Sequence, residues 1–142
     1  MGTELAKHLI ANNDYEVRVW NRTLDKTTPL VDAGATAYPT AAEAVTGADV
    51  VITALFGPKT VRSVVIEPDL IPAGIPWIDT TTVSPQDAEE FAANVSTYIA
   101  CPVVGTWGRP VPENLVCTWA APIRSCGSWL PALYPPGRTR AG

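Results

Sequence analysis

The sequence predicts an α/β protein with a parallel sheet in its first hundred residues and an irregular tail after them. Helical and strand-like patterns alternate with short connections along those hundred residues, as in successive βαβ units. Residues 49–55 (DVVITAL) form an apolar run rich in β-branched side chains, typical of a strand buried on both faces. Residues 107–142 hold three of the five tryptophans and six of the fourteen prolines. Their apolar residues follow neither the helical period of 3.6 nor the strand period of 2, so we assign them no secondary structure.

Each expected element has a local signal. Leu5 and Leu9 lie one turn apart, which favours a helix. Thr40 with Glu43 has the spacing of a capping box, and Ser84 followed by Pro85 is typical of a helix start. In chain order we expect a helix over 2–12, a strand over 17–20, a helix from Leu24 to Gly34 interrupted near Pro29, an edge strand over 35–38, a helix from Thr40, a strand over 49–55, a helix over 59–65, a strand over 77–79, a helix over 84–95 and a strand over 98–100.

Length and composition narrow the class of protein. The 142 residues suffice for one domain, and 46% hydrophobic with 17% charged residues indicates a soluble globular protein. A net charge of −4 argues against a nucleic-acid partner, and no apolar run approaches the ~20 residues of a membrane span. The N-terminus has no signal-peptide pattern. The three cysteines lack metal-like spacing, and the chain has one histidine, so we expect a reduced, metal-free, cytoplasmic protein.

Five separated stretches occur in a distinctive order: Met1-Gly2 with Glu4-Leu5-Ala6, then VWNRT at 19–23, AAEA at 41–44 with ADVVI at 48–52, IDTTTVSP at 78–85, and PVVG at 102–105. Together these stretches, over about residues 1–106, resemble the β-hydroxyacid dehydrogenase family. Its members include 3-hydroxyisobutyrate dehydrogenase and 6-phosphogluconate dehydrogenase-like proteins and the glyoxylate/succinic semialdehyde reductases.

The resemblance implies a Rossmann-like, NADP-binding domain over 1–106 whose parallel sheet lacks its first strand. Gly2 corresponds to the last glycine of the phosphate-binding turn, where helix N–H groups meet the pyrophosphate. Where a Rossmann protein reads the adenosine ribose, this chain has Asn21, Arg22 and Thr23 and no carboxylate. Because an arginine there suits a 2′-phosphate, we expect NADP rather than NAD; an ordinary exposed arginine is the alternative.

The remaining cofactor candidates follow the later strands. Leu55 and Phe56 would lie over the cofactor, although a core strand entering a loop explains them equally well. Thr82 matches a threonine beside the nicotinamide ribose in the family, or it serves helix entry. His8, Cys101 and Asp79 favour plain interpretations: an exposed helix residue, a packed side chain and a loop hydrogen-bonder.

The expected function is that of the NADP-binding portion of an oxidoreductase. In the family, hydride passes between NADP(H) and a small hydroxyacid or semialdehyde. Val104 replaces a substrate-contacting serine, and the family's catalytic lysine lies in a domain not found here, so no catalytic residue is assigned. The alternative is a non-catalytic Rossmann-type nucleotide-binding or interaction module; substrate identity and oligomeric state stay open.

The tail at 107–142 resembles a translation in the wrong reading frame. Trp107 and Trp119 have a single codon each, and a shifted frame forces glycine at both, where the family pattern has glycine. We therefore expect a chain incomplete at both ends, marginally folded and without turnover on its own, whose tail packs poorly.

Overall fold

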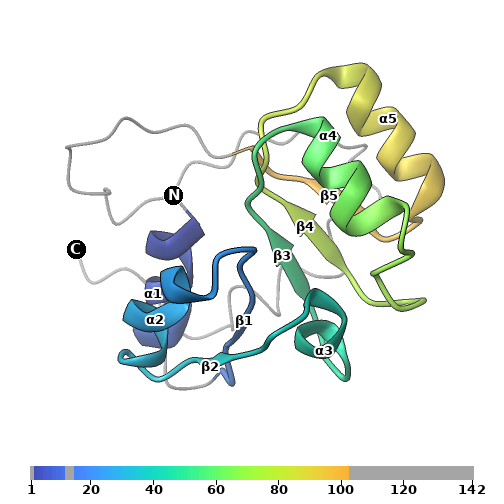
Figure 1. Cartoon of the computed structure of the whole chain (residues 1–142). Helices are drawn as coiled ribbons and strands as arrows, with labels where there is room; N and C mark the ends of the chain where they lie inside the picture. The colour runs from blue at the N-terminus through green and yellow to red at the C-terminus, as the bar shows by residue number, and fades with distance from the viewer. Residues whose placement is uncertain (1, 12–14, 103–142) are drawn as a thin grey trace, which may run out of the picture.

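The computed structural model describes residues 2–11 and 15–102 (Figure 1). The irregular tail expected at 107–142 and the assignment of Val104 lie outside these residues. Within them, helices alternate with parallel strands, which confirms the predicted α/β class.

A three-stranded parallel sheet forms the larger part of the described fold. Its order is β3 (Val51–Thr53), β4 (Trp77–Asp79) and β5 (Tyr98–Ala100). Val51 is in register with Trp77, and Trp77 with Tyr98. The bounds expected for the last two strands are confirmed. The strand expected over 49–55 is shorter, because the chain leaves the ladder at Val50, which is 40% exposed, and again at the exposed Ala54.

Two helical segments cover one face of this sheet (Figure 1). They are α4 (Pro58–Val61), which continues as the π-helical turn η2 (Arg62–Ile66), and α5 (Pro85–Asn94). The helix expected over 59–65 is therefore only partly α-helical. Between helices and sheet lies the main core, whose fully buried members are Val61, Val65, Trp77 and Phe91.

The centre of this core is aromatic. The ring of Trp77 lies edge-on to Tyr98 with centroids 4.7 Å apart, and Phe91 lies 6.1 Å from Trp77 and 5.9 Å from Tyr98. Such tilted pairs are favourable because the ring edges carry partial positive charge and the faces partial negative charge. One side chain from each of β4, α5 and β5 thus fixes α5 against the sheet.

The second sheet pairs β1 (Arg18–Val19) with β2 (Thr36–Ala37), also in parallel. Beside it lie α1 (Gly2–Ala11), the 3₁₀ turn η1 (Leu24–Thr27) and α2 (Thr28–Val31), as Figure 1 shows. The described strands form two sheets, because no ladder joins β1 to β3. This agrees with the expected parallel sheet that lacks its first strand, since that strand would lie between these two. The side chain of Arg18 in β1 connects this part to the end of the helix over 41–45, since Arg18 Nη1 donates to the Thr46 carbonyl at 2.7 Å.

Both predicted helix starts are confirmed with their caps. Thr40 and Glu43 form a complete capping box at α3 (Ala41–Val45), and Ser84 caps α5 with Pro85 in its first turn. Asp87 completes a second capping box with Ser84, which sequence reasoning had not identified. Each box satisfies backbone N–H groups that a helix start otherwise leaves unpaired.

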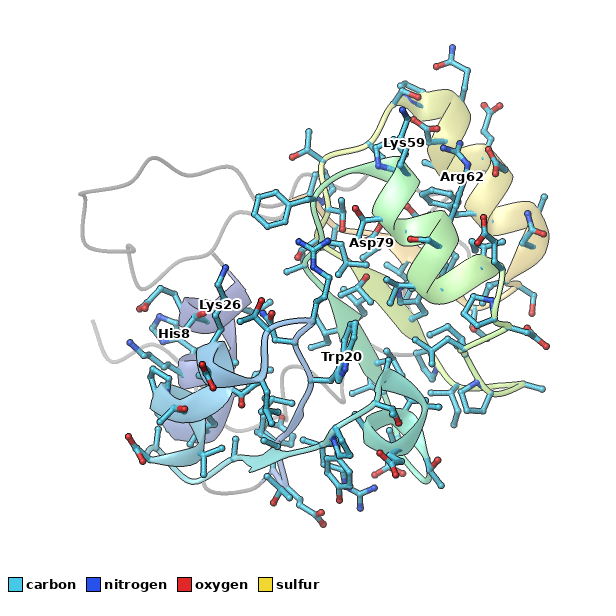
Figure 2. The ribbon with its side chains drawn as sticks, viewed as in Figure 1. His8, Trp20, Lys26, Lys59, Arg62 and Asp79 are labelled. Carbon is cyan, nitrogen blue, oxygen red and sulfur yellow. The ribbon has the colours of Figure 1, made fainter. Side chains whose placement is uncertain are left out.

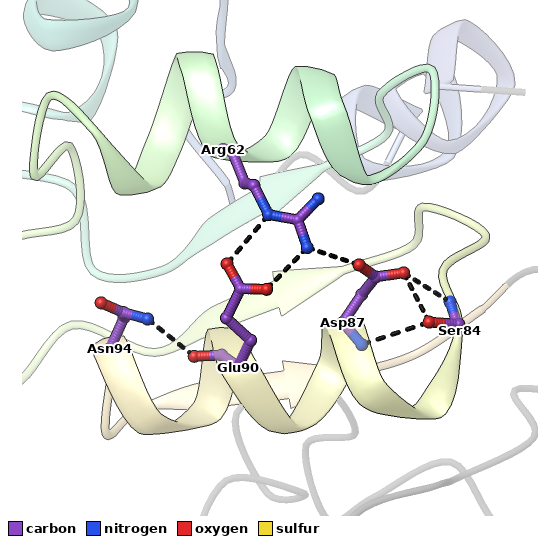
Figure 3. Close-up of polar contacts among 5 residues, drawn as sticks. All are labelled: Arg62, Ser84, Asp87, Glu90 and Asn94. Atoms are coloured by element: carbon purple, nitrogen blue, oxygen red, sulfur yellow. Dashed lines mark hydrogen bonds and ion pairs between the residues drawn. The ribbon is translucent and has the colours of Figure 1, made fainter.

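Asp87 has a further partner on η2 (Figure 3). Arg62 Nη2 donates to Asp87 Oδ1 at 2.5 Å, and the same guanidinium spans both carboxylate oxygens of Glu90. The guanidinium carbon also lies 5.5 Å from the centre of the Phe91 ring. Together the two acids hold the pKa of Arg62 above its ordinary value, the hydrogen bond with Glu90 being the main cause. Arg62 thereby joins the two helical segments that cover the sheet.

Candidate functional site

The predicted cofactor residues other than Gly2 follow the carboxyl ends of β1, β3 and β4. We call residues 20–23, 54–57 and 80–84, together with Gly2, the carboxyl edge. Figure 1 shows β1 and β3 running in the same sense, so their following loops emerge on the same side. Ligands of open parallel sheets bind at such an edge.

Gly2 lies at the start of α1, against the end of β3. A Cβ atom built on Gly2 would lie 3.1 Å from Ala54 Cβ and 3.9 Å from the Ala54 carbonyl oxygen. That approach is tight for any larger residue, so glycine lets the helix start come close to the strand end. Close contact between a helix start and a strand end is also what the third glycine of a dinucleotide-binding turn provides.

The segment after β1 presents its arginine to solvent. Asn21 closes a local turn by accepting a hydrogen bond from the Thr23 N–H at 3.0 Å. Arg22 is exposed, and none of the residues that the structure describes forms an ion pair with it. The group predicted to bind the 2′-phosphate is thus an accessible guanidinium, that of Arg22. The side-chain oxygen of Asn21, in contrast, already accepts a hydrogen bond from the Thr23 N–H.

Four polar side chains tie the ends of β3 and β4 together, and we call them the threonine–aspartate cluster: Thr53, Asp79, Thr80 and Thr81. Thr53 Oγ1 donates to Asp79 Oδ1 at 2.8 Å, and the Thr81 N–H donates to the same oxygen at 3.0 Å. The Thr80 N–H and hydroxyl both donate to the Thr53 carbonyl, at 2.8 and 2.7 Å. The chain that leaves β4 is therefore hydrogen-bonded to Thr53, the last residue of the neighbouring strand β3.

The cluster reaches the predicted cofactor contacts through Thr81. The Leu55 N–H donates to Thr81 Oγ1 at 3.0 Å, which fixes the chain just before Phe56. Phe56 is 95% exposed, and the Gly57 that follows has a φ of 88°, which L residues rarely adopt. Thr82, next to Thr81, is exposed as well. An aromatic side chain and a threonine are thus presented to solvent from two loops that the hydrogen bond between Leu55 and Thr81 holds together.

Asp79 is the most unusual group at this edge. It was expected to be a loop hydrogen-bonder, but it is the last residue of β4 and only 1% exposed (Figure 2). Burial raises the pKa of its carboxyl above the ordinary value, although the hydrogen bonds from Thr81 and Thr53 oppose the rise. Burial, followed by the charge of Asp79, likewise raises the pKa of the Tyr98 phenol.

The plain interpretations of two other residues are confirmed: His8 is exposed on α1, and Cys101 is 5% exposed. Over residues 2–11 and 15–102, no three acidic, histidine or cysteine side chains gather as metal ligands would. None of the helices in this part of the chain is long and apolar enough to cross a membrane. A shallow hollow formed by 69, 71–74 and 94–97 lies before β4 and β5, at the end of the sheet opposite the candidate site.

Comparison with known families gives a match over most of the chain. Residues 1–110 match the family described as the NAD binding domain of 6-phosphogluconate dehydrogenase. The uncharacterized oxidoreductase YfjR of Bacillus subtilis (strain 168) is 34% identical over 113 residues, covering 74% of this chain and 39% of that protein. The "Probable 3-hydroxyisobutyrate dehydrogenase-like 1, mitochondrial" of Arabidopsis thaliana is 35% identical over 102 residues, covering 68% and 30%. The cytokine-like nuclear factor N-PAC of Drosophila pseudoobscura pseudoobscura is 38% identical over 65 residues, covering 46% and 10%.

Solved structures give the same fold. An imine reductase from Pseudomonas sp. superposes with a TM-score of 0.78 at 22% identity, over 94% of this chain and 48% of that one. A 3-hydroxyisobutyrate dehydrogenase of Mycobacterium tuberculosis with L-serine gives 0.64 at 26%, over 70% and 36%. A reductive aminase from Aspergillus terreus in complex with NADPH gives 0.65 at 26%, over 75% and 38%. The chain spans less than half the length of each of these proteins.

Proposed function

Because the chain belongs to the β-hydroxyacid dehydrogenase family, through the NAD binding domain that residues 1–110 match, we propose that its carboxyl edge binds NADP(H) in preference to NAD(H). Residues 1–106 would be the nucleotide-binding part of an oxidoreductase acting on a small hydroxyacid, semialdehyde or related compound. When bound, the cofactor supplies or accepts a hydride.

The proposed preference for NADP over NAD rests on Arg22. A carboxylate after the second strand of such a sheet would accept from the ribose 2′-OH of NAD. Here the guanidinium of Arg22 stands at that place, exposed and without an ion-pair partner among the described residues. A guanidinium donates two parallel hydrogen bonds to a phosphate, a geometry that suits the 2′-phosphate of NADP.

The other edge residues fit the rest of a dinucleotide. The close contact of Gly2 with Ala54 leaves the first N–H groups of α1 near the strand ends, where a pyrophosphate is stabilised by the helix dipole. Leu55 and Phe56 offer apolar surface, and Thr82 offers a hydroxyl for the nicotinamide ribose. The reductive aminase that was solved with NADPH supports the same preference.

A second candidate function is a nucleotide-binding or interaction module without catalysis. The similarity to the nuclear factor N-PAC over 65 residues favours keeping it, since that protein is named for a role other than an enzymatic one. Both candidates use the same edge, so nucleotide binding is the property to measure first.

The test compares NADPH with NADH by calorimetry on the full chain. A charge-assisted pair of about 1.5–3 kcal/mol corresponds to roughly a tenfold to hundredfold preference for NADPH. Arg22→Ala should erase the preference, and Arg22→Asp should reverse it by offering a carboxylate to the 2′-OH. Lys7→Ala, which removes an exposed positive charge paired with Glu4 on α1, is the matched control and should change neither affinity. Equal affinities of the unaltered chain for NADPH and NADH would refute the proposal.

A further inference from the structure

We propose that Asp79 is a positioning residue for the nicotinamide end of the carboxyl edge. It would act through Thr81, which holds the Leu55 backbone, and so set the placement of Phe56 and Thr82 without touching the cofactor. This inference rests on the proposed nucleotide binding and adds to it the residue that orders one end of the site.

The connection from Asp79 to the candidate contacts is short and continuous. Asp79 Oδ1 accepts from the Thr81 N–H at 3.0 Å, and Thr81 Oγ1 accepts from the Leu55 N–H at 3.0 Å. The first bond fixes the backbone just before Thr82, and the second fixes the backbone just before Phe56. A single carboxyl oxygen therefore controls both loops that we expect to meet the nicotinamide end.

The proton positions in the cluster follow from its donors. The Trp77 indole N–H has no lone pair to offer, so it donates to Thr53 Oγ1, at 2.9 Å. Thr53 must then direct its own proton to Asp79 Oδ1, at 2.8 Å. Oδ1 thus receives two donors, from Thr53 and Thr81, and it acts purely as an acceptor.

The positioning role of Asp79 does not require a negative charge on its carboxyl group. Asp79 Oδ2 and the Tyr98 hydroxyl are both buried and interact with each other, an interaction that lowers the pKa of Asp79 and raises that of Tyr98; neither meets another partner within the part of the chain that the structure describes. Oδ1 can accept from Thr53 and Thr81 in the charged and in the neutral carboxyl alike, because the proton of the neutral form can lie on Oδ2. An asparagine has the same shape, with an acceptor at one position and a donor at the other. An asparagine at position 79 should therefore perform the positioning role of Asp79, whereas an alanine should not.

The opposite end of the site is built separately. Arg22 follows β1, which belongs to the two-stranded sheet, whereas Asp79 and Thr81 hold the end of the three-stranded sheet. None of the hydrogen bonds of the threonine–aspartate cluster involves residues 20–23. A ligand that lacks the nicotinamide half should consequently be indifferent to Asp79.

The experiment measures the affinity of the full chain for NADPH and for adenosine 2′,5′-bisphosphate, which carries the adenosine end alone. Asp79→Ala and Thr81→Val should each weaken NADPH about tenfold, the effect of losing roughly 1.4 kcal/mol of interaction, and leave the bisphosphate within about twofold. Asp79→Asn should bind NADPH like the unaltered chain. Thr97→Val is the control for Thr81→Val, because Thr97 also donates to a backbone group, the Ile75 carbonyl at 2.6 Å, at the end of the sheet opposite the carboxyl edge.

Each outcome decides the matter. Unchanged NADPH affinity in Asp79→Ala and Thr81→Val, or an equal loss for both ligands, would overturn the positioning role while leaving nucleotide binding intact. An unaltered chain that binds neither ligand would overturn the proposed function and this inference together. If Asp79→Ala does not fold, Thr81→Val and Asp79→Asn still decide between the outcomes, because both keep the side-chain volume.

Discussion

Replacing Thr53 by valine should destabilise the fold more than its small change of shape suggests. Valine has the shape of threonine without the hydroxyl, so the neighbouring side chains stay in contact. The hydroxyl, however, accepts from Trp77 Nε1 and donates to Asp79 Oδ1 in a region where Trp77 is 0% and Asp79 1% exposed. The variant therefore leaves a buried indole N–H unpaired and removes one of the two donors to Asp79.

The magnitude follows from these two losses. An unpaired buried donor costs about 1–3 kcal/mol, and a lost hydrogen bond whose acceptor keeps another partner costs about 1 kcal/mol. We expect Thr53→Val to lower the free energy of unfolding by about 2–4 kcal/mol, a large share of the ~5–15 kcal/mol typical of a domain. Thr53→Ser keeps the hydroxyl and loses one methyl group, so it should cost only about 1 kcal/mol.

Urea unfolding followed by far-ultraviolet circular dichroism measures these values without relying on tryptophan fluorescence. The decisive comparison is with Trp77→Phe, which removes the indole N–H that Thr53→Val leaves unpaired. The double variant should be more stable than the sum of the two single losses predicts, by about 1–2 kcal/mol. A Thr53→Val loss below about 0.5 kcal/mol, or strict additivity with Trp77→Phe, would refute the account of the hydroxyl as a bridge.

Two further predictions concern the same sheet and its helix. Ser84→Ala should lower the free energy of unfolding by about 1 kcal/mol, because Ser84 Oγ accepts from the Asp87 N–H at the start of α5. Threonine can accept the same hydrogen bond, so Ser84→Thr should keep most of this stability. Equal thermal melts for the serine and alanine proteins would contradict this. Since burial raises the pKa of Asp79 above the about 3.9 of an exposed aspartate, its contribution to stability is present below that value and is lost as pH rises through the native pKa. Tyr98, the titratable group that faces Asp79, has its pKa raised as well and stays neutral. Asp79→Asn should therefore remove the part of the pH slope that lies between the unfolded pKa and the native pKa of Asp79; parallel stability profiles for the two proteins would contradict the assignment.

The elements that sequence predicted well are those with local causes. The starts of α3 and α5 depend on side chains three residues apart, Thr40 with Glu43 and Ser84 with its first turn, so the pattern is visible in the sequence. The shortening of β3 is not visible in this way. The apolar run 49–55 has the composition of a strand throughout, and only the positions of the neighbouring elements determine that Val50 and Ala54 lie outside the ladder.

Some residues of the candidate site could likewise be predicted from the sequence, and others could not. The positions of Asn21 to Thr23, Leu55 and Thr82 after strands could be predicted, because strand order and parallel pairing decide which loops share an edge. The role of Asp79 could not, since its partner Thr53 is 26 residues away. One signal was present in the sequence: each of two neighbouring buried strands ends in a polar residue. The register that makes Thr53 and Asp79 direct partners came only from the structure.

The short strands explain why this cluster matters both to stability and to binding. β3 and β4 contribute only three residues each, so the backbone ladder alone supplies few hydrogen bonds at the carboxyl edge. The threonine–aspartate cluster extends that ladder with side chains, and its last bond, from the Leu55 N–H to Thr81, lies in the loop proposed to meet the nicotinamide. Variants that weaken the cluster should therefore lower stability and NADPH affinity together. Variants at Arg22, on the other sheet, should change the choice between NADPH and NADH at constant stability.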